Sequence, residues 1–349
     1  MPAFQQAERV LEGAVASRVF PGAVAEIGRG EARLATLIHG RLRYSDGSAP
    51  TSERTIYDLA SLTKVLATTA IAVEMVADNR LRLEDRVARW IPEWSGIDRT
   101  SVTLQDLLEH CSGLPAHRRY FESLAGRTAY ESAIASEPLA YAPRWQSIYS
   151  DPGFMLLGFV LENAGGSRLD ALFDVWRDRR LGSDVELGFL PSASHSRIAP
   201  TEVTAADGEI LGRVHDENAA ALGGVAAHAG LFGTAEAVGR AARWWLIALS
   251  ATAKRPQKAL LDRFVQKSVV PGSSRALGWD TMLPTSSCGT RLSSQAIGHT
   301  GFTGTSLWID PALDLYVVLL SNRVHPTRQG EGIKDVRVAL HDAVVADLS

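Results

Sequence analysis

The sequence predicts an α+β fold in which an antiparallel sheet is flanked by the two terminal helices and a mainly helical domain is inserted. Strand-like segments lie near the two ends of the chain, helical spacing dominates between them, and helical patterns open and close the sequence. Because both ends supply strands, residues 1–60 and 270–349 are expected to form one discontinuous sheet domain around a helical domain of residues 61–269. The cleft between two such domains is a common place for an active site.

Eight segments have the apolar spacing or composition of helices. The first is amphipathic and is ended by Pro21 and Gly22, whose residue types stop helices. Helices are expected at residues 3–18, 61–76, 103–110, 152–163, 168–179, 235–249, 259–268 and, closing the chain, 331–346.

Strands are indicated by short apolar runs between turn residues. They are expected at residues 23–27, 33–39, 276–280, 306–310 and 315–321, with a short extended piece at 55–59. Asp310 and Pro311 begin the turn of a hairpin between the last two strands.

Composition excludes several classes of protein. The length of 349 residues suggests two domains or one large one. With 36 basic and 39 acidic residues, the net charge is −3, so the chain does not have the excess of basic residues that nucleic-acid binding needs. A hydrophobic content of 46% and a charged content of 21% argue against disorder. Cys111 and Cys288 are too few for a disulfide framework; both are free or they form one bridge.

Membrane and targeting signals are not visible in the sequence. No run approaches the ~20 apolar residues of a spanning helix. Charged residues such as Arg9 and Glu12 interrupt any apolar signal region at the N-terminus. We therefore expect a cytoplasmic protein, or a periplasmic one if a leader has been removed. The sequence does not indicate an oligomeric state.

The first chemical motif is Ser61-Leu62-Thr63-Lys64. Ser61 lies where a helix is expected to begin, and Lys64 lies on the same helical face, so the two side chains can meet. A serine at a helix N-terminus could attack a carbonyl while its own N–H holds the developing oxyanion. A buried Lys64 with a lowered pKa could accept the serine proton. Alternatively, Ser61 is a helix cap and Lys64 a solvated lysine.

Two further motifs lie near strand and helix ends. Tyr149-Ser150-Asp151 precedes an apolar helix, and His299-Thr300-Gly301 precedes a strand. Taken singly, they are explained as a packing tyrosine, an aspartate N-cap and a polar strand end. Their order and spacing after the serine-x-x-lysine motif are more specific, because three such elements form the pattern of penicillin-recognising serine enzymes.

The chain therefore resembles the class C β-lactamase-like serine hydrolases, which include D,D-carboxypeptidases, D-amino-acid peptidases and family VIII carboxylesterases. The resemblance extends over residues 19–326 and includes the segments 104–115, 214–219, 230–232 and 298–309. It implies a β-lactamase/D,D-peptidase-like fold and an acylated serine, without a cofactor, and it leaves the substrate open.

The resemblance implies roles for individual residues. Ser61 is the acylated nucleophile, and Lys64 and Tyr149 handle its proton, in an order that the sequence leaves open. The oxyanion hole is formed by the backbone N–H groups of Ser61 and Phe302.

Other residues are expected to line the substrate. His299 and Thr300 face it, Gly301 leaves room for the scissile group, and Trp145 lies close enough to Tyr149 to touch an acyl group. His299 stands where a lysine is usual; a histidine is mostly neutral at pH 7 and holds a carboxylate less firmly.

Asp151 stands where the family usually has asparagine. An ionised aspartate only accepts hydrogen bonds, which suits a substrate amine or an ion pair with Lys64 better than a β-lactam amide.

Two other groups of residues are interpreted as structural. His215, Asp216, Glu217 and His228 do not have the spacing of a zinc signature, so no metal site is expected. Cys111, beside His110 at an apolar helix end, is expected to be buried and inert.

These observations favour a serine hydrolase that cleaves small carboxylic esters through a Ser61 acyl-enzyme, with weak β-lactam hydrolysis. The first alternative is a D-alanyl-D-alanine carboxypeptidase, a D-aminopeptidase or a β-lactamase; the second is a non-catalytic penicillin-type sensor. The three catalytic side chains argue against the sensor. The expected partner is a small ester or amide, not nucleic acid or a membrane.

Overall fold

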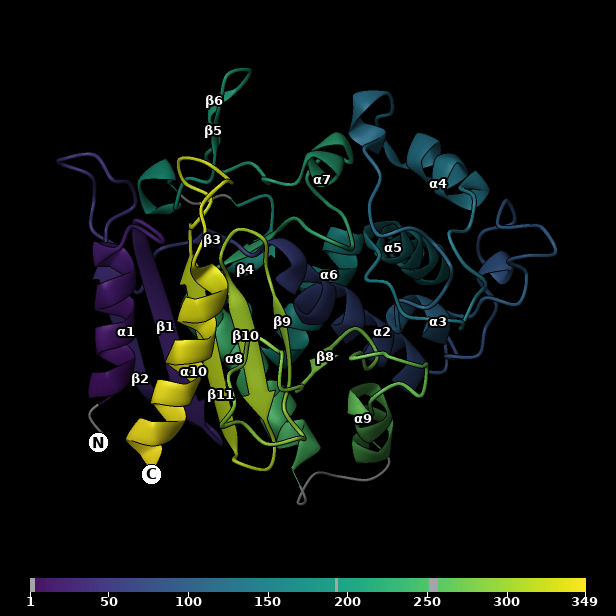
Figure 1. Cartoon of the computed structure of the whole chain (residues 1–349). Coiled ribbons are helices and arrows are strands. Elements are labelled where there is room, and N and C mark those ends of the chain that lie inside the picture. Colours follow the sequence, from purple (N-terminus) through teal and green to yellow (C-terminus); the bar gives the residue numbers. More distant parts are fainter. Residues whose placement is uncertain (1–3, 192–193, 251–256) are drawn as a thin grey trace.

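The fold is built around a six-stranded antiparallel sheet, as the sequence predicts. The computed structural model describes residues 4–191, 194–250 and 257–349. In the sheet, the two N-terminal strands lie beside the four C-terminal ones in the order β2-β1-β11-β10-β9-β8 (Figure 1). Their bounds are β1 Gly22–Arg29, β2 Ala32–Gly40, β8 Asp280–Thr281, β9 Ile297–Thr300, β10 Ser306–Asp310 and β11 Leu315–Ser321.

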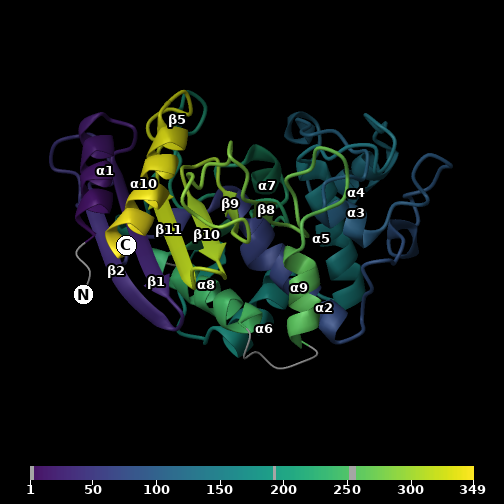
Figure 2. The same cartoon turned by 60° about the horizontal axis from the view of Figure 1, so that its bottom comes forward.

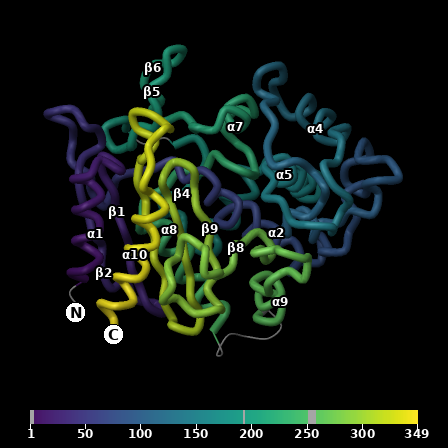
Figure 3. Tube along the Cα trace, in the orientation of Figure 1, coloured from purple at the N-terminus to yellow at the C-terminus, as the bar shows by residue number. Residues whose placement is uncertain are grey.

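Helices cover both faces of this sheet. The terminal helices α1, Gln5–Ala16, and α10, Ile333–Leu348, lie side by side on one face (Figures 1 and 3). Helix α8, Ala235–Leu249, packs on the other face against β1 and β11 (Figure 2). All seven residues of β11 are buried, as expected of a strand covered on both sides.

The remaining helices form a group beside the sheet. They are α2 Thr69–Ala77, α3 Leu104–Leu108, α4 Arg127–Ser136, α5 Asp151–Gly165, α6 Leu169–Arg180, α7 Glu217–Ala221 and α9 Gln257–Val265. Short 3₁₀ turns occur at Val87–Arg89, Tyr120–Glu122 and His195–Arg197.

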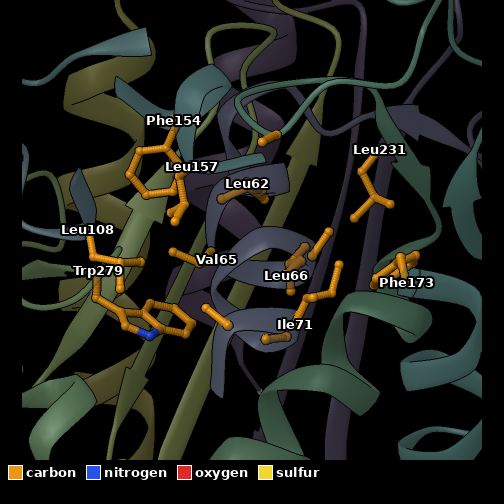
Figure 4. Close-up of a cluster of buried hydrophobic side chains, with 14 of the residues drawn as sticks. Leu62, Val65, Leu66, Ile71, Leu108, Phe154, Leu157, Phe173, Leu231 and Trp279 are labelled. Atoms are coloured by element: carbon orange, nitrogen blue, oxygen red, sulfur yellow. The ribbon is translucent and has the colours of Figure 1, made fainter. Parts of the chain in front are cut away.

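The helix that follows the first motif is the centre of the apolar core. It begins as a 3₁₀ turn, Ala60–Leu62, continues as a π-helical turn, Lys64–Thr68, and becomes α2. The segment Ala60–Ala77 is long and apolar enough to cross a membrane, but 83% of it is buried inside the protein, as in the core helix of a soluble fold. Figure 4 shows its side chains enclosed by residues of other elements: Leu108, Phe154, Leu157, Phe173, Leu231 and Trp279.

Small strands position the start of this helix. β3, Tyr57–Asp58, pairs with β7, Leu231–Gly233, which pairs with β4, Leu187–Phe189. A separate hairpin joins β5, Val203–Thr204, to β6, Gly208–Glu209. None of β4 to β7 was expected, because strands of two or three residues leave no periodicity to detect.

Two expectations about the late strands are wrong. Strand character was expected at residues 276–280, but the structure has a strand only at β8. Residues 276–278 form a bend, in which Gly278 has a φ of +84° and donates its N–H to the Leu108 carbonyl instead of to a strand. β9 was not expected as a separate strand.

Candidate active site

Ser61 is positioned by a strained turn at the end of β3. Ala60 has a φ of +47°, which is uncommon for a residue with a Cβ, and its N–H donates to Asp58 Oδ1 at 2.8 Å. This turn leaves Ser61 partly exposed at the start of the buried helix.

Lys64 is fully buried, and its ammonium has three acceptors. Its Nζ lies 3.3 Å from Ser61 Oγ, 2.8 Å from Asp151 Oδ1 and 2.9 Å from the His228 carbonyl. Burial acts to lower the pKa of Lys64, but the charge and hydrogen bond of Asp151 oppose it, and the pKa is raised above its usual value. The expected lowered pKa is therefore wrong, because the sequence does not show how close the Asp151 carboxylate lies.

Tyr149 is enclosed by rings and cations. Its ring centroid lies 4.7 Å from that of His110, and 4.8 Å from Lys64 Nζ. Arg275 Cζ lies 5.1 Å from the same centroid. Burial raises the pKa of Tyr149, although Lys64 and a hydrogen bond with Ser61 oppose the shift. Tyr149 is thus a neutral phenol near pH 7.

Asp151 opens helix α5, whose N-cap is Ser150. Its Oδ1 contacts Lys64 as described, and its Oδ2 lies 3.7 Å from His117 Nδ1. Burial would raise the pKa of Asp151, but the Lys64 charge and the His117 hydrogen bond hold it below its usual value. Asp151 was expected either to bind a substrate amine or to form an ion pair with Lys64, and in the structure it forms the ion pair.

His299 is buried in β9 and does not titrate near neutral pH. Its Nδ1 lies 2.8 Å from the Thr300 carbonyl, which can only accept, so Nδ1 carries the proton. Burial and the positive charges of Arg275 and Lys64 hold the pKa of His299 well below its usual value. His299 is therefore neutral at pH 7, in agreement with the expectation that it holds a carboxylate less firmly than a lysine does.

Gly301 serves the packing of the chain. A Cβ on Gly301 would lie 2.1 Å from Thr305 Oγ1 and 2.6 Å from the Leu59 carbonyl oxygen. The space that the missing side chain leaves is filled by protein. Gly301 also lines the pocket beside Ser61, so the interpretation that it leaves room for the scissile group stays a prediction.

The two N–H groups expected to form the oxyanion hole are available. Within the described ranges, neither the Ser61 nor the Phe302 N–H donates to another residue. The Phe302 ring is 49% exposed and lies between Arg323, whose Cζ is 4.5 Å from its centroid, and the His215 ring at 5.8 Å.

A pocket of about 420 Å³ opens beside the nucleophile. Arg275, Arg323 and Arg337 line it, although no sequence motif singled them out. The other lining residues are Ser61, Tyr149, Asp280, His299, Thr300, Gly301, Phe302 and Ile333. Asp151 and Trp145 do not line it, and Trp145 is 75% exposed.

The remaining candidates have structural partners. His215 Nε2 contacts Glu202 at 3.0 Å, and His228 Nε2 contacts Asp216 at 2.9 Å. Among the residues that the structure describes, no group of three or more His, Cys, Asp or Glu side chains could hold a metal.

Both cysteines are buried free thiols. Burial raises the pKa of Cys111 well above its usual value, as an inert thiol requires.

A nucleophilic serine joined to a buried lysine and tyrosine beside an antiparallel sheet defines the class of penicillin-recognising serine hydrolases. A sequence model of the Beta-lactamase family matches residues 7–341, and the chain belongs to this family. The resemblance and the fold expected from the sequence are thereby confirmed, and the chain is a β-lactamase-like hydrolase.

The chain is similar to a relative in sequence and to two solved structures in fold. The chain is 32% identical over 304 residues to a protein of Escherichia coli K12 named "Putative D-alanyl-D-alanine carboxypeptidase", covering 78% of this chain and 70% of the relative. It resembles the structure of EstCE1, "a hydrolase with promiscuous acyltransferase activity", with a TM-score of 0.78, 21% identity and 97% coverage of both chains. A penicillin-binding protein homologue from Caulobacter crescentus has a TM-score of 0.76 and 19% identity, covering 99% of this chain and 97% of its own. At these identities the two structures show the fold alone.

Proposed function

We propose that this hydrolase cleaves an amide or ester bond in substrates that carry a free carboxylate on the leaving group, as a D,D-carboxypeptidase does. The observation that supports this is the unbalanced charge of the pocket beside Ser61. In the described part of the chain, no carboxylate lies within 4.0 Å of Arg323 or Arg337, and Arg275 has only Asp280, at 3.8 Å. Guanidinium groups match a carboxylate in shape and charge.

The first chemical step uses Ser61 Oγ as nucleophile. It attacks the scissile carbonyl, and the N–H groups of Ser61 and Phe302 stabilise the negative charge that develops on the carbonyl oxygen. Because Lys64 already holds its proton, the serine proton passes to Tyr149 in its phenolate form, which the Lys64 ammonium stabilises.

The remaining steps release the leaving group and hydrolyse the acyl-enzyme, and they return a proton to Ser61. Tyr149 gives it to the leaving amine or alcohol as the carbonyl bond to that group breaks, which leaves the acyl-enzyme. Tyr149 then takes a proton from water as the water oxygen attacks the acyl carbonyl. Collapse of this second tetrahedral intermediate returns the proton to Ser61 and releases the acid.

The names of the relatives support the same substrate class, since the proteins of 31–32% identity are named "Putative D-alanyl-D-alanine carboxypeptidase". A second candidate function is hydrolysis of small carboxylic esters, with weak β-lactam hydrolysis. It is favoured by the neutral state of His299 and by the exposed apolar ring of Phe302 in the pocket, which suit an uncharged substrate.

Matched substrates separate the two candidates. We expect kcat/KM for an N-acyl-D-Ala-D-Ala peptide to exceed that of its C-terminal amide at least about tenfold, which corresponds to one ion pair. An enzyme that hydrolyses p-nitrophenyl butyrate and treats the two peptides alike would be an esterase. Ser61→Ala should abolish all turnover. A fluorescent penicillin that stays bound without turnover, in a protein inactive on every substrate, would identify a sensor.

A further inference from the structure

We infer that Asp58 is a positioning residue that holds the two N–H groups of the oxyanion hole at a fixed separation. This inference rests on the proposed function, because it takes Ser61 and Phe302 as the two donors. These residues lie far apart in the sequence, on the helix start and on the turn after β9, so a contact between the two elements must fix their distance.

The Asp58 carboxylate is buried and has no cationic partner. It is 2% exposed, and among residues 4–191, 194–250 and 257–349 no Lys, Arg or His side chain pairs with it. Its Oδ1 accepts from the Ala60 N–H at 2.8 Å, and its Oδ2 accepts from the His215 N–H at 2.7 Å. A buried carboxylate without a counter-ion is costly, so its two backbone bonds call for a reason beyond packing.

The Oδ1 bond controls the first donor. Ala60 has a positive φ that disfavours residues with a Cβ, and the carboxylate captures its N–H in that conformation. Because Ala60 directly precedes Ser61, its backbone conformation determines where the Ser61 N–H points.

The Oδ2 bond controls the second donor through His215. The His215 ring stacks on the Phe302 ring with an interplanar angle of 22°. The same turn is tied to Asp58 again, because Thr303 Oγ1 donates to the Asp58 carbonyl at 2.7 Å. Asp58 thus contacts the element of each donor directly.

The site requires a carboxylate and not merely a polar group. Two N–H donors approach the two oxygens from different residues. An asparagine offers one oxygen and one NH₂, so one of the two donors would face another donor. Asp58→Asn therefore releases either Ala60 or His215 while it preserves side-chain volume.

The test compares Asp58→Asn with a matched control, Asp310→Asn. Asp310 is also fully buried and accepts backbone N–H bonds, from Ser293 and Leu313, but it lies at the far end of β10. With active enzyme counted by covalent labelling of Ser61, we expect Asp58→Asn to lower kcat for p-nitrophenyl butyrate by roughly 10- to 100-fold. KM should stay within about threefold, since ground-state binding does not use the hole.

A transition-state analogue distinguishes positioning from stability. Phenylboronic acid forms a tetrahedral adduct with the serine, so its inhibition constant should rise in Asp58→Asn by about the same factor as kcat falls. Asp310→Asn should change neither quantity per active site, whatever it costs in stability. Unchanged kcat and boronate inhibition in Asp58→Asn would overturn the inference.

A second variant keeps the test decisive if Asp58→Asn does not fold. Thr303→Val removes only the hydroxyl bond to the Asp58 carbonyl, and it should lower kcat and weaken boronate inhibition in parallel; a change in neither would overturn the inference. A Ser61→Ala variant that stays active would instead refute the proposed function.

Discussion

Lys64 Nζ lies 2.8 Å from Asp151 Oδ1, and this contact decides which catalytic side chain can accept a proton. A buried lysine without a carboxylate partner loses its charge, because burial lowers its pKa. Here the carboxylate reverses that effect and Lys64 stays an ammonium. The proton-accepting role therefore falls to Tyr149, which the ammonium stabilises as a phenolate.

The first prediction concerns the pH dependence of the wild-type enzyme. Tyr149 must lose its proton to act as a base, and its pKa is raised above the usual value by burial. Activity should therefore increase with pH and still be rising at about pH 10, near the usual pKa of tyrosine. The measurement is kcat/KM for a neutral ester against pH. A plateau from about pH 8 upward would instead identify a base of lowered pKa.

The second prediction concerns Asp151→Asn. The negative charge of Asp151 raises the pKa of Lys64 and that of Tyr149. Its removal should lower both pKa values, so the rising limb of the pH profile should move to lower pH. Asp216→Asn is the control, because Asp216 also lies at the start of a helix and contacts a histidine but does not bond Lys64. If the rising limb of the pH profile stayed in place or moved to higher pH, the proposed role of the ion pair would be contradicted.

The third prediction concerns coupling within the catalytic group. Lys64→Met and Tyr149→Phe should each lower kcat by roughly 100-fold or more, and the double variant should lose little beyond that, since residues that act as a unit are not additive. Tyr120→Phe serves as control, because it also removes one tyrosine hydroxyl, which bonds Glu137 and not Lys64 or Ser61. Losses that simply multiply would show that Lys64 and Tyr149 do not share one proton path.

The sheet and the catalytic triad of motifs could be predicted because their signals are local. Strand-like segments at both chain ends indicate a sheet built from both, and the spacing of Ser61 and Lys64 places them on one helical face. The order of the three motifs along the chain then indicates the family, and the family implies the fold. By contrast, strands as short as β4 to β7 leave no period in the sequence.

The electrostatics could not be predicted, because they depend on distance and burial. The pKa of Lys64 depends on a carboxylate that the fold brings to 2.8 Å, and the neutral state of His299 depends on its enclosure beside two cations. The arginines of the pocket belong to a loop, a strand end and a helix, and only the tertiary structure brings them together.

The fourth prediction tests the packing role of Gly301. Gly301→Ala would place a Cβ against both Thr305 and the Leu59 backbone, so it should destabilise the fold by about 1–3 kcal/mol and reduce activity. Gly13→Ala in α1 is the control: nothing lies within 4 Å of its added Cβ, so stability should rise slightly. The measurement is urea denaturation of each variant. A stable Gly301→Ala variant with altered substrate preference would support the substrate-facing interpretation.

The fifth prediction concerns how the pocket recognises a carboxylate. Arg275 lines the pocket and lies over the Tyr149 ring, 5.1 Å from its centroid, and arginine stays charged at every accessible pH. Arg275→Gln should therefore lower the ratio of kcat/KM between the free D-Ala-D-Ala peptide and its C-terminal amide by about tenfold. Because both substrates use the same Tyr149, the ratio cancels any effect of Arg275 on the Tyr149 proton. Arg275→Lys should restore part of the ratio.

The same substrate pair tests whether His299 contributes. Because the pKa of His299 is held well below its usual value, its charge does not change as the pH passes through about 6.5, the usual pKa of histidine. KM of the free peptide and KM of the amide should then have the same pH profile around that pH in the wild-type enzyme. If KM of the free peptide alone rose through about pH 6.5, His299 would be protonated in the complex. Carboxylate recognition would then belong to β9 and not to the arginines.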